Sequence, residues 1–172
     1  MRPICAGLVL SLLLPALSAA QEPPSRSQIL AAGWDVMQKA GFCSFVTIGN
    51  DGHPQARVVD PLGPVDDSTV WVATNPLTRK VDQVRRDPRV TLLCFEAATS
   101  SYVTILAKAA IVADAAEKAR RWKASWTPFY PAGAKGDAVL IRLTPSRMEV
   151  VSEARGITPD PQTWLPLAVT FP

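Results

Sequence analysis

The chain has 172 residues with 18 basic and 15 acidic side chains, so its formal net charge is only +3. This length and a hydrophobic fraction of 48% suit one domain with a sizeable core. A nucleic-acid partner normally requires a clustered basic face, so the nearly balanced charge argues against one.

Residues 1–20 have the pattern of a secretory signal peptide. Arg2 precedes an apolar run over residues 4–17, and small residues end the segment at Ala20. The run is short for a membrane span of about 20 residues and no second run follows it, which argues against the alternative of a membrane anchor. We therefore expect residues 21–172 to form the mature domain, periplasmic or secreted and free of the membrane after signal cleavage.

The first element expected in the mature domain is a helix over residues 28–40. Ser25 and Gln28 can form a capping box at its start, and Gly41 ends it. Strands dominate the remainder, and the short connections, including the turn at residues 50–52, indicate antiparallel pairing. The sequence therefore predicts a mainly β fold with flanking helices. We expect strands at residues 42–48, 55–59, 69–73, 89–96, 102–112 and 138–151, and a second helix at residues 115–126.

Cys43 and Cys94 each lie inside an apolar strand pattern. We expect both to be buried free thiols, because free cysteine packs well as a small hydrophobic residue. An exported compartment would permit a disulfide, but strand positions alone do not show that the two side chains meet.

The segment Thr74-Asn75-Pro76-Leu77-Thr78-Arg79-Lys80 places two hydroxyls and two cations directly after an apolar strand. We expect a helix to begin near Thr78, whose side chain can accept a backbone N–H at the helix start. Spare N–H donors, hydroxyls and the guanidinium would then converge on an anionic group such as a phosphate. The alternative is that Arg79 and Lys80, with residues 85–86, belong to a solvated helix face.

Four motifs occur in a fixed order over roughly residues 28–152: Arg57-Val58-Val59, Thr74 to Lys80, Asp87-Pro88-Arg89-Val90 and Arg142-Leu143-Thr144-Pro145. This order resembles the pyridoxamine 5′-phosphate oxidase-like, FMN-binding split-barrel superfamily, particularly its general-stress-protein branch. The resemblance implies a six-stranded antiparallel split β-barrel that forms a homodimer and binds FMN at the dimer interface.

The resemblance also implies roles for individual residues. Tyr102 stands where related oxidases often carry a glutamine facing the flavin, and a tyrosine could stack on the ring or donate a hydrogen bond. Trp126, Phe129 and Tyr130 resemble a loop that lies beside the flavin of the partner subunit. The remaining cofactor contacts carried over by position are Arg57, Val58 and Val59 for the flavin, and Thr74, Thr78, Arg79 and Lys80 for its phosphate.

The function that the resemblance implies is an exported FMN-dependent oxidoreductase of unknown substrate. A flavin ring would carry the chemistry, which agrees with the lack of an evident acid–base pair in the sequence. One alternative is a non-catalytic flavin- or haem-binding stress protein, and another is an exported barrel without a cofactor. His53, the only histidine, lies at a hairpin tip and is expected to be exposed rather than to bind haem iron, and no metal-ligand spacing occurs.

Overall fold

The computed structural model describes residues 22–66 and 68–172, so the expected signal peptide at residues 1–20 lies outside the described residues. No helix in this part of the chain is long and apolar enough to cross a membrane. In chain order the described elements are α1 (Arg26–Ala40), β1 (Cys43–Ile48), β2 (Pro54–Val59), β3 (Pro61–Val65), β4 (Thr69–Thr74), α2 (Arg79–Arg86), β5 (Arg89–Glu96), β6 (Ser101–Val112), α3 (Ala115–Arg121), β7 (Val139–Val151) and β8 (Leu167–Thr170), with short 3-10 turns at Ala124–Trp126, Gly133–Lys135 and Glu153–Arg155.

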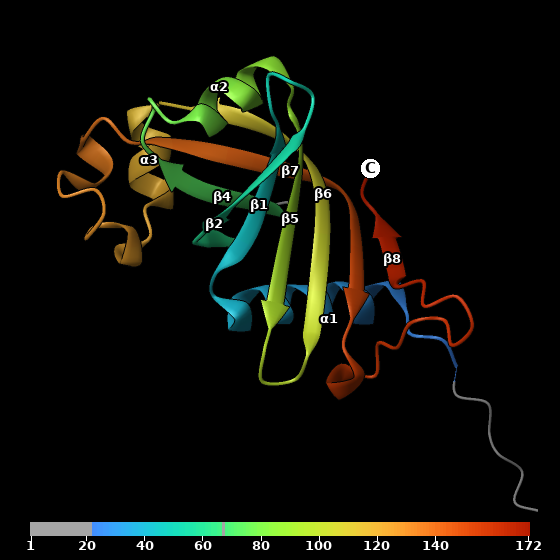
Figure 1. Cartoon of the computed structure of the whole chain (residues 1–172). Coiled ribbons are helices and arrows are strands. Elements are labelled where there is room, and N and C mark those ends of the chain that lie inside the picture. The colour runs from blue at the N-terminus through green and yellow to red at the C-terminus, as the bar shows by residue number, and fades with distance from the viewer. Residues whose placement is uncertain (1–21, 67) are drawn as a thin grey trace, which may run out of the picture.

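The strands form one curled antiparallel sheet in the order β2-β1-β5-β6-β7-β4-β3, with β8 also paired to β7 (Figure 1). The predicted fold class is confirmed, but β3 and β8 raise the number of described strands above the expected six. Pro61 and Pro64 made β3 a poor strand candidate, and they are tolerated because β3 lies at the edge of the sheet. β8 has only four residues, too few for a clear alternating pattern.

β7 pairs with β6 along one edge and with two different strands, β4 and β8, along the other, and a bulge separates its two halves. Leu106 pairs with Arg147 and Ala107 with Pro145, which leaves Ser146 without a partner on β6. A proline cannot donate to a sheet ladder, and a bulge is one of the places where it is tolerated. The first half of β7 pairs with β4 and the second half with β8. The bend therefore opens the sheet into the split form of a barrel.

α1 packs against β5, β6 and β7 and begins at the predicted capping box. The Ser25 hydroxyl accepts from the Gln28 amide at 3.3 Å, and the Gln28 side chain accepts from the Ser25 amide at 2.8 Å. Gly33 faces the sheet so closely that an added Cβ would lie 2.4 Å from the Met148 sulfur. This close approach explains why a glycine occupies the middle of a helix despite its cost.

Cys43 and Cys94 form a disulfide, so the expectation of two free thiols is wrong. The two residues lie directly opposite each other on β1 and β5, with 4.3 Å between their Cα atoms. Both side chains are buried on the core face of the sheet. The sequence pattern correctly predicted burial, but the β1–β5 register that brings the sulfurs together joins segments 51 residues apart.

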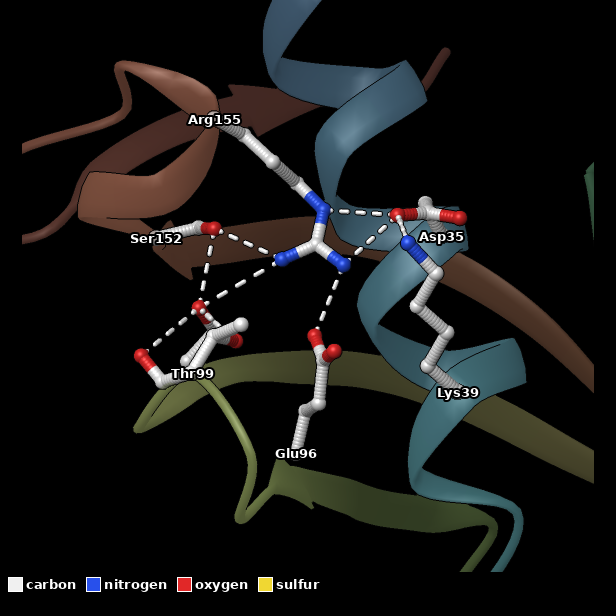
Figure 2. Close-up of polar contacts among 7 residues, drawn as sticks. Asp35, Lys39, Glu96, Thr99, Ser152 and Arg155 are labelled. Carbon is white, nitrogen blue, oxygen red and sulfur yellow. Dashed lines mark hydrogen bonds and ion pairs between the residues drawn. The ribbon is translucent and has the colours of Figure 1, made fainter.

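Arg155 ties three segments together at the end of the sheet far from α2 (Figure 2). Its guanidinium donates to Asp35 of α1 at 2.7 Å, to Glu96 at the end of β5 at 2.7 Å, and to the Ser152 hydroxyl at 2.9 Å. Hydrogen bonds from Lys39 and Arg155 lower the pKa of Asp35. This network fixes α1 and the β5–β6 hairpin against the segment that follows β7.

Candidate cofactor site

The candidate site lies where β4 ends and α2 begins. Thr74 is the last residue of β4, and the turn that follows is fixed by its own side chains: the side-chain Oδ1 of Asn75 accepts from the Leu77 amide at 2.8 Å. The Thr78 hydroxyl donates to the Asn75 backbone oxygen at 2.9 Å. Thr78 is the first flanking residue of α2, but its side chain makes no cap bond. The expected capping role is therefore wrong, because the hydroxyl is used to close the turn.

Two hydroxyls and one ammonium group gather at this point. Lys80 Nζ donates to Thr74 Oγ1 at 2.9 Å, and Thr74 Oγ1 lies 3.2 Å from Thr78 Oγ1. Thr74 is buried and Lys80 is half-buried. Burial, together with the positive charge of Arg57, lowers the pKa of Lys80. The ammonium group is thus placed in a setting where a negative charge would stabilise it.

Arg57 reaches the same region from β2 and is held by oxygen acceptors of the protein. It donates to the Phe45 carbonyl oxygen at 3.1 Å, to Thr47 Oγ1 at 2.6 Å and to Gln83 Oε1 at 3.0 Å. Burial and the charge of Arg79 lower its pKa. Gln83 of α2 also donates to Gln55 of β2 at 2.8 Å. The guanidinium therefore fastens α2 to the β1–β2 hairpin.

Thr47 and Gln83 are members of this network that the sequence did not reveal. Both are buried polar side chains, and Thr47 donates to Gln83 at 2.6 Å. The sequence could have indicated the burial of Gln83, because this residue lies between Val81 and Val84 on the buried face of an otherwise polar helix. A polar residue on such a face requires a buried partner.

None of Arg57, Arg79 and Lys80 forms an ion pair with a carboxylate within residues 22–66 and 68–172. Neighbouring cations do: Arg85 pairs with Asp82, and Lys123 pairs with Asp60. The charge of Arg79 lowers the pKa of Arg57, and the charge of Arg57 lowers the pKa of Lys80, so the three cations lie near one another without an ion pair to a carboxylate among the described residues. Together with the two threonine hydroxyls, this donor set fits a bound phosphate.

A cleft of about 260 Å³ opens beside this cluster. We call it the cationic cleft; its lining includes Val58, Val59, Thr74, Lys80, Trp126 and Tyr130. The structure thus brings five predicted site residues into one cavity, while Thr78, Arg57 and Arg79 adjoin the same cluster. Tyr102 does not line the cleft, because it lies on β6 between Phe95 and Val151.

Trp126, Phe129 and Tyr130 form an aromatic wall of the cationic cleft of their own chain, and their expected place beside the flavin of a partner subunit stays a prediction. Trp126 Nε1 donates to the Asp60 carbonyl oxygen at 3.0 Å, and the Tyr130 hydroxyl donates to the Ala73 carbonyl oxygen at 3.3 Å. Trp122 packs edge-to-face against both aromatic rings, at centroid distances of 5.7 and 6.0 Å. Burial raises the pKa of Tyr130 despite an opposing hydrogen bond with Thr74, so its hydroxyl stays protonated.

The site offers no evident ligand for haem iron or another metal. His53 is exposed in the β1–β2 turn, and the residues that line the cationic cleft include no histidine. Among the described residues, no three His, Cys, Asp or Glu side chains lie close enough to hold a metal ion. Valine and aromatic side chains beside a cluster of cations and hydroxyls instead suit a flat, phosphorylated cofactor.

The family model of pyridoxamine 5′-phosphate oxidase matches residues 34–152 of the chain. Fold and sequence thus agree, and the protein belongs to the pyridoxamine 5′-phosphate oxidase-like family of split barrels.

Solved structures have the same fold at low sequence identity. A Clostridium acetobutylicum protein related to general stress protein 26 is 14% identical with a TM-score of 0.70, covering 86% of this chain and 97% of its own. General stress protein 26 of Bacillus anthracis is 17% identical with a TM-score of 0.63, covering 82% and 97%. An F420 reductase is also 17% identical with a TM-score of 0.54, covering 66% and 93%. No curated protein matches the chain.

Proposed function

We propose that the protein is an exported FMN-dependent oxidoreductase. The observation that carries this proposal is the cluster of Arg57, Arg79 and Lys80, which gathers positive charge beside two hydroxyls and the cationic cleft. None of the three cations forms an ion pair with a carboxylate among the described residues. Membership of the pyridoxamine 5′-phosphate oxidase-like family and likeness to an F420 reductase support a flavin-type redox cofactor.

The chain's own residues would bind and orient this cofactor. Thr74, Thr78 and Lys80 would hold the phosphate, with Arg79 at the start of α2 adding charge. Val58 and Val59 of β2 and the aromatic wall would enclose the ring and exclude water. A bound flavin would supply hydride or electron transfer, and the protein would tune access and orientation.

Calorimetric titration with FMN and riboflavin tests the phosphate assignment, because the two ligands share a ring and differ by the phosphate. A charge-assisted contact contributes about 1.5 to 3 kcal/mol, so Lys80→Ala or Arg79→Ala should weaken FMN binding by about ten- to a hundredfold. Riboflavin binding should hardly change. Arg85→Ala is the matched control on the same helix, since that arginine pairs with Asp82 in solvent and should matter little. Equal affinity of the unmodified protein for FMN and riboflavin would contradict the assignment.

A non-catalytic flavin carrier is the second candidate, and one observation favours it. Asp60 is the only carboxylate that lines the cationic cleft, and it is already bound by Lys123 and by Ser125 at 2.6 Å. No free general base therefore faces the cleft among the described residues. Stopped-flow reduction of the FMN complex by NADH or NADPH, followed by reoxidation in air, separates the two functions: repeated cycling supports the enzyme, and stable binding without cycling supports the carrier.

The proposal includes a homodimer. Val58 and Phe95 are 69% and 55% exposed, and Leu93 is also exposed although all three lie in strands. Apolar side chains exposed on a sheet face indicate an interface, and a two-fold dimer is the commonest closed assembly. Tyr102 pairs with Phe95 across β5 and β6, so a dimer through this face would bring Tyr102 toward the partner.

Light scattering should show a dimer when FMN is present, and the substitution Phe95→Glu should convert this dimer to a monomer. A monomeric unmodified protein would refute the assembly.

Export to the periplasm or outside the cell is the remaining part of the proposal. The Cys43–Cys94 disulfide supports it, because disulfides persist mainly in oxidising compartments. N-terminal sequencing of the mature protein should begin near Gln21. Recovery of an uncleaved chain from the cytosol would contradict export.

A further inference from the structure

A second cleft lies on the other side of Phe129 and Tyr130, and we propose that it binds an uncharged, flat aromatic molecule. Its volume is about 600 Å³, and its lining comes from residues 75–77, 129–133 and 136–138; we call it the apolar cleft. We infer further that this molecule is the substrate of the enzyme, and that step rests on the proposed oxidoreductase function. The binding itself rests on the cleft alone.

Large apolar side chains stand exposed on both walls of the apolar cleft. Leu77 is 90% exposed on one wall, and Phe129 is 73% exposed on the other. Pro76 and Pro131 add further apolar surface. Side chains of this kind gain free energy when a ligand removes them from water, and the volume lies within the usual range of about 300 to 1,000 Å³ for small-molecule sites.

The charge of the lining decides which kind of aromatic molecule fits. Among the described residues that line the apolar cleft, Asp137 is the only one with a charged side chain, and none is a lysine or arginine. An anionic molecule would be repelled here and attracted to Lys80 in the cationic cleft. The two neighbouring clefts therefore separate a phosphorylated cofactor from an uncharged second molecule.

The walls of the apolar cleft are fixed in place by polar contacts that leave its surface free. Lys118 is only 7% exposed, and its Nζ donates to the carbonyl oxygens of Gly136 at 2.7 Å and Ala138 at 3.1 Å, on either side of Asp137. Asn75 fixes the opposite wall through its bond from the Leu77 amide. A preformed cleft avoids much of the ordering cost of binding, as expected of a ligand site.

The position of the apolar cleft suits a molecule that reacts with a cofactor in the cationic cleft. Phe129 and Tyr130 line both cavities, so the two clefts adjoin the same aromatic loop. The Tyr130 hydroxyl is held by the Ala73 carbonyl oxygen beside Thr74. A ligand in the apolar cleft would thus contact the aromatic wall of the cofactor site from its other face.

Calorimetric titration of the purified protein with 2-naphthol, an uncharged redox-inert probe, tests the proposal with and without saturating FMN. We expect one 2-naphthol bound per chain in both cases. Leu77→Ala should weaken 2-naphthol binding by about five- to tenfold, the loss expected when a ligand covers part of a leucine side chain, and should leave FMN binding unchanged. Leu165→Ala is the matched control, because Leu165 is 65% exposed but lies outside the apolar cleft.

Naphthalene-2-sulfonate, which has the same ring and a negative charge, tests the charge selection. It should bind about threefold or more weakly than 2-naphthol, and Asp137→Asn should remove that difference. Three results would each overturn the inference: no saturable binding of 2-naphthol, equal effects of Leu77→Ala and Leu165→Ala, or loss of FMN affinity in Leu77→Ala. Failure of FMN to bind while 2-naphthol binds normally would instead refute the proposed function and leave the apolar cleft as a ligand site.

Discussion

Reduction of the Cys43–Cys94 disulfide should lower the free energy of unfolding by about 4 kcal/mol. The bond links residues 51 positions apart in the chain. Closing a loop of that length removes about 14 cal/mol/K of conformational entropy from the unfolded chain, which corresponds to about 4 kcal/mol at 25 °C. The contribution is large beside the total stability of about 5 to 15 kcal/mol that is usual for a domain.

Urea unfolding with and without dithiothreitol measures this contribution. With a urea dependence of about 2 kcal/mol/M, the midpoint should fall by about 2 M on reduction. Each sample is equilibrated in urea from the unfolded side, because both sulfurs are buried and are reduced readily only when the chain opens. The double variant Cys43→Ala with Cys94→Val has no cross-link, so dithiothreitol should leave its midpoint unchanged.

Two results would refute this reasoning. One is an identical urea midpoint for the unmodified protein in oxidising and reducing buffer. The other is a thiol titration of unfolded, unreduced protein that counts both Cys43 and Cys94 as free. Either result would return these residues to the role of small buried hydrophobic side chains, and the disulfide would no longer support export.

The remaining predictions concern the phosphate cluster and the packing of α1. FMN affinity should fall as the pH rises toward 10.5, because Lys80 has a pKa below that ordinary value and loses its charge early; Lys80→Arg should remove this pH dependence in calorimetric titrations. Arg155→Met should cost about 3 kcal/mol of stability in urea unfolding because it strands the Glu96 carboxylate, while the exposed Arg147→Met should cost less than about 1 kcal/mol. Gly33→Ala should cost about 1 to 3 kcal/mol in the same assay because its methyl group would collide with the side chains facing α1.

Local chemistry predicted most of the fold correctly. The capping box at Ser25 and Gln28 and the turn at residues 50–52 each depend on residues close together in the chain. The strands of the β1–β2 hairpin followed from alternation and that turn. The disulfide between Cys43 and Cys94 did not, because strand alternation fixes the face on which a side chain lies but not which strand becomes its neighbour.

In the candidate site, too, the local turn could be predicted from the sequence, whereas contacts between distant segments could not. The turn from Thr74 to Lys80 is a local structure, and its two hydroxyls converge as the sequence predicted. The cation that joins them is the Lys80 ammonium group, whereas the sequence analysis expected the Arg79 guanidinium. Arg57 was assigned as a flavin contact, but its guanidinium is bound by Phe45, Thr47 and Gln83. Its role in the described structure is to place α2 and to add positive charge. The contact of Arg57 with a flavin, which the resemblance implied, stays a prediction.

The two walls of the cationic cleft are held by different kinds of contact, and the position of only one of them follows from local chemistry. Val58 and Val59 belong to β2, whose position follows from a hairpin turn a few residues away. Trp126 reaches the cleft through a bond to the carbonyl oxygen of Asp60, and Lys123 binds the Asp60 side chain from the same loop. These contacts join segments more than 60 residues apart. A charge pair and an indole bond of this range leave no periodic pattern, so the position of the aromatic loop against Asp60 could not be predicted from the sequence.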